Sequence, residues 1–170
     1  MVNDDTITSV DEYVVDINDI EDVEPLPKQK YVAEIKDVQV RRVENRNDGS
    51  VLTKVSVSYH IPTQQFPPNY DVENAPDGMK LYTPFNGTTV DCGEGSQPSR
   101  RGAAQWKKFL KSHGHDGAVR FVRRDDLDGH WSVDQSVLDM LIGRLVEVLI
   151  DHNKYEGEIR TQISSISRLD

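Results

Sequence analysis

This chain of 170 residues is poor in cysteine and has no long apolar run, and each absence excludes a class of protein. Its one cysteine, Cys92, forms no intrachain disulfide and supports no cysteine-based zinc site. No apolar run approaches the roughly 18 residues that a membrane-spanning helix needs. The chain also does not open with a basic region followed by an apolar stretch, as a signal peptide would. We therefore expect a soluble, cytoplasmic protein that does not bind membranes.

Signatures of catalysis are equally scarce. There is no P-loop, GxGxxG, nucleophile elbow or HExxH motif. The stretch 124–131 resembles part of a calcium loop but lacks its full spacing and its terminal glutamate. His113 and His115, with one distant cysteine, form a weak metal pattern. We expect no enzymatic activity, no metal and no cofactor. A metal-dependent nuclease is a distant alternative, because Glu34 and Lys36 have no partnering acidic pair at usable spacing.

Basic residues are missing from the first 25 positions. This stretch holds nine acidic residues and no lysine or arginine, and removing those nine from the total of 29 leaves 20 acids against 20 bases. The formal net charge of -9 therefore belongs to one end of the chain. Pro25 and Pro27 favour an extended linker after it. We expect an acidic, flexible N-terminal tail at 1–25 and one domain at 26–170. Apolar residues recur among the acids, which indicates docking onto a partner or onto the domain's own basic surface; a solubilising tail is the alternative.

Alternating apolar residues predict β-strands in most of the domain. In the stretch 31–44, Ala33 and Ile35 share one face, whereas Val38 and Val40 have the opposite parity. A change of parity inside a continuous strand is what a β-bulge produces. We therefore expect a long first strand that bends midway.

The order of the remaining elements indicates the fold class. Strands are predicted at 51–61, within 79–85, at 118–122, 144–152 and 157–169, and helices at 99–114 and 132–143. Three strands, a helical middle and two closing strands are typical of the OB-fold. We expect a mainly β protein with helices, namely a five-stranded Greek-key barrel with a helical insertion between its third and fourth strands.

The helix predicted at 99–114 carries five basic residues and no acid. Ser99 is placed to cap its start and Gly114 to end it. Trp106 lies on an apolar stripe that would dock the helix onto a core. The basic face is then either a solvated surface or a surface that binds a nucleic-acid backbone, because clustered lysine and arginine displace the counterions of phosphates.

Further basic residues and aromatics lie near the predicted first hairpin and in the loops that follow it. In an OB-fold the first hairpin and the face of the second and third strands form the usual oligonucleotide surface, and exposed aromatics there stack on bases. Phe85 is a further aromatic candidate for stacking. The candidate nucleic-acid-binding residues are Arg41, Arg42, Arg46, Lys54, His60, Phe66, Tyr70, Tyr82, Arg100, Arg101, Lys107, Lys108, Lys111, Arg123 and Arg124.

The chain resembles small OB-fold single-stranded DNA-binding proteins that bacteriophages encode for replication and recombination. Three stretches carry the resemblance: LPKQKYVAEIKDVQV at 26–40, WKKFLKSHG at 106–114, and LIGRLVEVLIDHNKYEGEIRTQISSI at 141–166. The resemblance implies binding of single strands without sequence preference, through basic grooves and stacked aromatics, in an infected bacterial host. Members of this class often recruit replication proteins through an acidic C-terminal tail, whereas the acidic segment here is N-terminal.

The sequence thus favours a non-catalytic, phage-type protein whose partners are single-stranded DNA and phage or host replication proteins, the latter through the acidic tail. Two alternatives involve protein partners instead of nucleic acid. One is a phage structural or adaptor subunit, and the other is an inhibitor whose acidic tail mimics DNA. Fold alone does not choose among them, because OB-folds bind several kinds of ligand.

Overall fold

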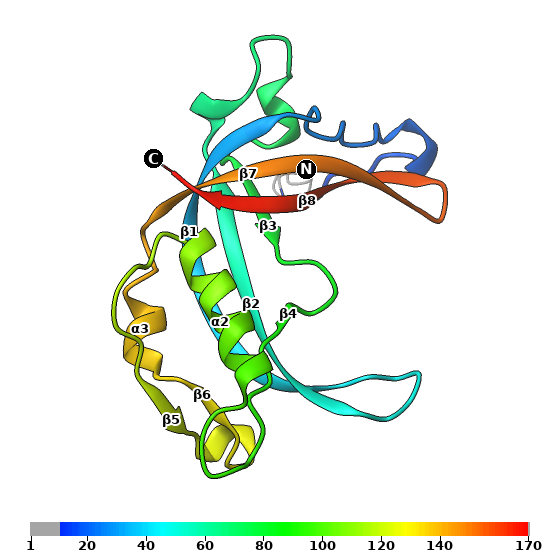
Figure 1. The fold of residues 1–170 in the computed structure, drawn as a ribbon. Helices are drawn as coiled ribbons and strands as arrows, with labels where there is room; N and C mark the ends of the chain where they lie inside the picture. Colours follow the sequence, from blue (N-terminus) through cyan, green and yellow to red (C-terminus); the bar gives the residue numbers. More distant parts are fainter. Residues whose placement is uncertain (1–10, 170) are drawn as a thin grey trace.

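A computed structural model describes residues 11–169 and shows a mainly β protein with few helices (Figure 1). Within these residues, six strands form one antiparallel sheet and two more form a small separate sheet. The strands are β1 (Lys30–Glu44), β2 (Val51–Ile61), β3 (Met79–Tyr82), β4 (Thr88–Thr89), β5 (Phe121–Arg123), β6 (Trp131–Val133), β7 (Leu145–Tyr155) and β8 (Glu158–Arg168). The α-helices are α2 (Arg100–Ser112) and α3 (Gln135–Asp139).

The bulge predicted in the first strand is confirmed. The register of β1 against β2 shifts between Ile35 and Asp37. Ala33 and Ile35 are buried before this point, and Val38 and Val40 are buried after it. The bulge lets one strand serve two partners, because β7 pairs with β1 ahead of the bulge while β2 continues along the rest of the strand.

The sheet does not close into the expected five-stranded barrel. Its strand order is β3-β2-β1-β7-β8, with β4 paired to β2, and no ladder among the described residues joins β3 to β8. The reason lies at the end of β3. Pro84 has no N–H to donate to a ladder, and Phe85 and Asn86 both have left-handed backbones, with φ of 54° and 65°. The chain therefore turns away after Thr83, and β3 is too short to pair along β8.

Helix α2 covers the inner face of the sheet (Figure 1). Ser99 caps it as predicted, since the Ser99 hydroxyl oxygen accepts a hydrogen bond from the Gly102 N–H at 3.1 Å. Trp106, which is 0 % exposed, belongs to the core together with the inward side chains of β1 and β2. Gly114 has a φ of 88° and follows the helix end, as its sequence position predicts. Burial of Trp106 thus turns the basic residues of α2 outward.

Two predictions in the region after α2 had wrong boundaries. The strand expected at 118–122 is β5, which begins only at Phe121. The helix expected at 132–143 shrinks to α3, because Trp131–Val133 pairs with β5 as strand β6 instead. The sequence pattern did not reveal this small second sheet, since strands of three residues are too short to show a clear alternation.

The expected acidic tail falls partly outside the described residues, which begin at Asp11. Residues 11–24 are all exposed, and the only helical element among them is a short 3₁₀ turn at Ile17–Asp19. Packing begins at Leu26, which is 0 % exposed and whose N–H donates a hydrogen bond to the Thr161 hydroxyl at 3.0 Å. In the part of the chain that is described, no helix has the length and apolar character needed to cross a membrane.

Candidate nucleic-acid interface

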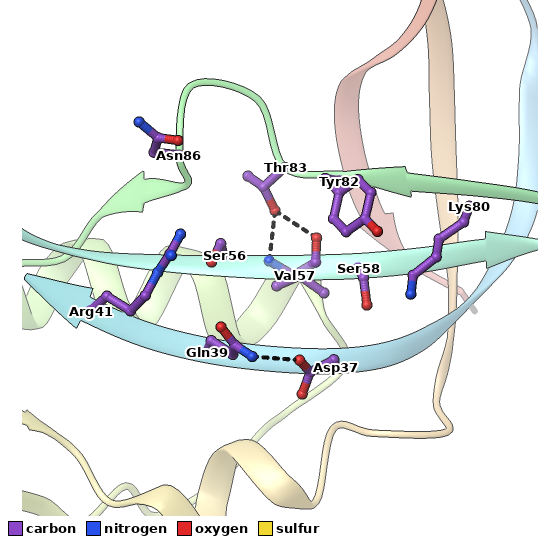
Figure 2. Close-up of a pocket in the computed structure, with 10 residues that line it drawn as sticks. All are labelled: Asp37, Gln39, Arg41, Ser56, Val57, Ser58, Lys80, Tyr82, Thr83 and Asn86. Atoms are coloured by element: carbon purple, nitrogen blue, oxygen red, sulfur yellow. Dashed lines mark hydrogen bonds between the residues drawn. The ribbon is translucent and has the colours of Figure 1, made fainter. Parts of the chain in front are cut away.

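The outer face of β1, β2 and β3 is hollowed by a groove of about 450 Å³, which we call the outer groove (Figure 2). Cross-strand pairing places its side chains next to one another, with Gln39 opposite Ser56 and Ser58 opposite Tyr82. Strand alternation explains the face, since Val55, Val57 and Tyr59 of β2 point to the core and the residues between them point outward. The groove is lined by Asp37, Gln39, Arg41, Ser56, Val57, Ser58, Lys80, Tyr82, Thr83 and Asn86.

Three cations stand in or beside the outer groove, against one carboxylate. Arg41 is exposed and lies directly opposite Lys54 across the β1–β2 ladder. The Lys54 ammonium donates to the Phe85 carbonyl at 3.3 Å. Lys80 lies on β3, with its nitrogen 5.6 Å from the centre of the Tyr82 ring. The acid, Asp37, accepts a hydrogen bond from the Gln39 amide at 2.9 Å, so the groove keeps a positive balance.

Two exposed aromatics lie at the end of β3 and just after it: Tyr82 lines the outer groove, and Phe85 lines a neighbouring pocket that reaches β7 and β8. The Tyr82 side chain is 62 % exposed and that of Phe85 is 85 % exposed. Thr83 anchors the chain between them, because its N–H donates to the Val57 carbonyl at 3.0 Å and its hydroxyl oxygen accepts from the Val57 N–H at 3.0 Å (Figure 2). Gly87 closes the following turn with a φ of 110°, where a Cβ atom would collide with the Val55 carbonyl oxygen. A rigid backbone therefore presents two aromatic rings to solvent.

The other two aromatic candidates pack inside the protein. Tyr70 is 7 % exposed, and its hydroxyl donates to the Glu24 carbonyl at 2.6 Å. Phe66 meets the Tyr70 ring edge-on, with 5.2 Å between ring centres, and packs against the core. These two residues hold the loop after β2 against the start of the domain. His60 lies at the end of the outer face, where its Nε2 is 2.7 Å from the Asp77 carbonyl oxygen.

Arg42 lies on the opposite side of the strand from its neighbour Arg41. Its guanidinium donates to the Asp91 carboxylate at 2.6 Å and to the Thr53 hydroxyl at 3.2 Å. Burial opposes ionisation of Asp91, but hydrogen bonds from the Gly93 and Thr53 backbone and from His130 together hold the pKa of that carboxyl below its usual range. The structure thus commits Arg42 to an internal ion pair and Arg41 to the outer groove.

The remaining loop arginines are placed in different surroundings. Arg46 is exposed in the turn between β1 and β2. Arg123 donates to the Glu94 carbonyl at 3.0 Å, and its guanidinium carbon lies 4.8 Å from the centre of the Trp131 ring. Arg124 pairs with Asp126 at 2.8 Å. Arg123 thus ties β5 to the loop before α2, Arg124 makes a local ion pair, and neither lines the outer groove.

Helix α2, which carries the remaining basic candidates, lies behind the sheet when it is viewed from the outer groove (Figure 2). All five are exposed: Arg100, Arg101, Lys107, Lys108 and Lys111. Lys108 alone of the five lines a second groove of about 510 Å³, which runs along the open seam between Thr83–Thr89 and β8. The structure therefore separates the predicted residues into an outer groove and a helix surface, with the seam between them.

Sequence reasoning did not single out Lys80, Gln39 and Asn86, which also line the outer groove. A signal for Lys80 was present, because it precedes Tyr82 by two residues in a short strand and must share its face. Asn86 had no such signal, since its position depends on a turn with left-handed backbone.

No known protein-family model matches this chain, and no curated protein is similar enough to count as a relative. The function is therefore argued from the geometry of the site.

Proposed function

We propose that this protein binds single-stranded DNA without sequence preference, and that the outer groove is its binding surface. The observation that carries the proposal is the combination of three cations in or beside the outer groove with the exposed Tyr82 ring that lines it, next to the exposed Phe85 ring at the end of the same segment. Cations along a groove attract the phosphate backbone, and exposed rings stack on bases of any identity. A duplex keeps its bases stacked on each other, so the rings favour a single strand.

The arrangement of the strands supports an OB-type core. Strands β1, β2 and β3 follow one another, and β7 returns after a long connection to lie beside β1. This is the order of a Greek key. The outer groove then occupies the face of the second and third strands, where OB-folds commonly bind oligonucleotides.

The proposed binding residues are fewer than the sequence indicates. Arg41, Lys54 and Lys80 provide the positive charge, and Tyr82 and Phe85 provide the rings. Arg42, Phe66 and Tyr70 are left out, because each is committed to an internal contact. The proposed setting is phage replication or recombination, in the cytoplasm of an infected bacterium.

A second candidate function is that of an adaptor that binds proteins. The observation that favours it is the acidic segment 11–24, in which Tyr13, Val14 and Ile17 are 89 %, 85 % and 78 % exposed. Within the main proposal, this segment is the contact for phage or host replication proteins.

The test is fluorescence anisotropy with labelled poly-dT and with a duplex of equal length, at two salt concentrations. We expect tighter binding to poly-dT and, with about three phosphates neutralised, a slope of about -2 for log K against log salt. Replacing Arg41 and Lys54 together with alanine leaves Lys80 and is expected to bring the slope to about -0.7. Tyr82→Ala should weaken binding about tenfold through the loss of one stacked base.

The matched control is the double replacement Arg100→Ala with Arg101→Ala. It also removes two exposed cations, but from helix α2, where neither residue lines the outer groove. We expect its slope to stay near that of the unchanged protein. Preference for the duplex, or an equal loss in both double variants, would contradict the assignment of the outer groove.

A further inference from the structure

An apolar pocket of about 360 Å³ lies beside helix α2. It is separate from the outer groove and from the groove along the seam. Its walls include Trp106 and Leu110 of α2, and Val119 and Phe121 from the segment that follows the helix. Two exposed lysines of α2, Lys107 and Lys111, also line it. The pocket thus combines an apolar interior with a positively charged rim.

The charge of this rim is not cancelled by the nearby acid. Asp116 is already engaged by Arg168, whose guanidinium donates to its carboxylate at 2.7 Å. Hydrogen bonding to Arg168 and the charge of Arg168 lower the pKa of Asp116, and Lys111 adds to the effect. The buried indole N–H of Trp106, a wall residue, has no acceptor in the described part of the chain. An apolar group that carries anionic oxygens suits such a pocket.

A segment of this chemistry occurs in the protein itself. Residues 11–24 hold seven acidic residues and no basic one. They expose large apolar side chains, of which Tyr13, Val14 and Ile17 are the most accessible. The Asp16 carboxylate accepts a hydrogen bond from the Asn18 N–H at 2.9 Å and so caps the short turn that carries Ile17. The segment presents apolar side chains and carboxylates together, which is the complement of the pocket.

The segment and the pocket of one molecule lie at different ends of it. The segment joins the domain at Leu26, which is bonded to Thr161 of β8. In Figure 1 the segment lies near the tip of the β7–β8 hairpin, while α2 and the chain after it lie on the other side. The occupant is therefore better supplied by another molecule.

We propose that the pocket beside α2 binds the acidic segment 11–24 of a second copy of this chain. An apolar side chain of the segment enters between α2 and 117–121, and its carboxylates pair with Lys107 and Lys111. Each copy offers one segment and one pocket, so reciprocal exchange closes a two-fold dimer. This contact lies outside the outer groove and does not depend on DNA binding.

The first test measures the binding of a labelled synthetic peptide with the sequence of residues 11–24 to the full chain. The charge reversal Lys107→Glu with Lys111→Glu is expected to weaken binding at least about fivefold, since two ion pairs become repulsions. The control, Arg100→Glu with Arg101→Glu, reverses two exposed charges of the same helix that do not line the pocket, and should stay within about twofold. Equal weakening by both variants would mean general charge attraction and would overturn the proposal.

Two further measurements examine the apolar contact and the second copy. A peptide in which Tyr13, Val14 and Ile17 are replaced by serine keeps every acid and is expected to lose binding. Sedimentation at low salt should show the full chain as a dimer and the Lys107→Glu, Lys111→Glu variant as a monomer with unchanged circular dichroism. Unaltered binding of the serine peptide, or a full chain that stays monomeric at every concentration, would refute the proposal.

Discussion

His113, just after α2, is a buried residue whose ionisation the fold opposes. Its Nδ1 lies 2.8 Å from the Phe109 carbonyl oxygen, so this nitrogen carries the proton, and its Nε2 then accepts from the Tyr59 hydroxyl at 2.6 Å. Burial lowers the pKa of His113 from 6.5 to about 4, although the bond to Phe109 opposes this. The folded protein therefore holds the ring neutral at pH values where the unfolded chain protonates it.

This pKa predicts a loss of stability in mild acid. Because the unfolded state binds the additional proton, the contribution of His113 is complete above about pH 6.5 and is lost as the pH falls toward 4. We expect the free energy of unfolding to fall by about 2 kcal/mol between pH 7 and pH 5. Urea titrations at the two pH values measure it, and His113→Phe should remove most of the difference. A variant that keeps the full pH dependence would assign it to other groups.

At the scale of the element, the tight approach of α2 to the loop before it makes one glycine necessary. Gly102 is buried in the first turn, and a Cβ there would meet the Asp91 carbonyl oxygen and lie 2.7 Å from the Cys92 Cα atom. Helix propensity alone predicts that Gly102→Ala stabilises by about 1 kcal/mol. We expect the opposite, a loss of about 1–3 kcal/mol, because two backbones are forced apart. Thermal unfolding of Gly102→Ala shows whether the variant is stabilised, as helix propensity predicts, or destabilised, as the close approach predicts. Ala104→Gly, at an exposed position, should cost about 1 kcal/mol and serves as the propensity control.

Elements were predictable where the pattern that defines them is local. The bulge in β1 was visible because parity changes between Ile35 and Val38, and the same parity rule places Arg42 with Val38 and Val40 on the inner side. The sequence therefore contained enough information to place Arg41 on the outer face of β1 and Arg42 on the inner face. For the early end of β3 it held one cause, Pro84, which cannot donate to a ladder, but not the left-handed backbone at Phe85 and Asn86 that turns the chain away.

At the scale of the whole molecule, the acidic segment and the domain differ in charge more than any two other parts of the chain. Deleting residues 1–22 removes eight of the nine acids and changes the formal net charge from -9 to -1. The truncated chain keeps Glu24, because the Glu24 carbonyl accepts a hydrogen bond from the Tyr70 hydroxyl. We expect the truncated protein to bind poly-dT more tightly, most clearly at low salt, where screening between the segment and the DNA is weakest. Dissociation constants of the full-length and truncated chains at low and high salt measure the effect. Equal constants at both salts would show that the charge of the segment does not oppose DNA binding.

The separation of the two basic surfaces also belongs to this scale, and the sequence did not predict it. Clustering of lysine and arginine along the chain indicated a single surface, whereas α2 packs on the inner face of the sheet through Trp106, and none of its five basic residues lines the outer groove. Which side of a sheet a helix covers depends on contacts between distant residues. Local patterns of charge and hydrophobicity do not contain that information.

The ladder between β1 and β7 also determines when the protein can fold during its synthesis. It pairs Lys30 with Leu149, so the first long strand waits for one of the last elements. A ribosome adds about 5–20 residues each second, and β1 and β2 therefore emerge as a hairpin whose apolar face stays uncovered for several seconds. Until β7 leaves the exit tunnel, that hairpin depends on the earlier arrival of α2 to shield it from other nascent chains.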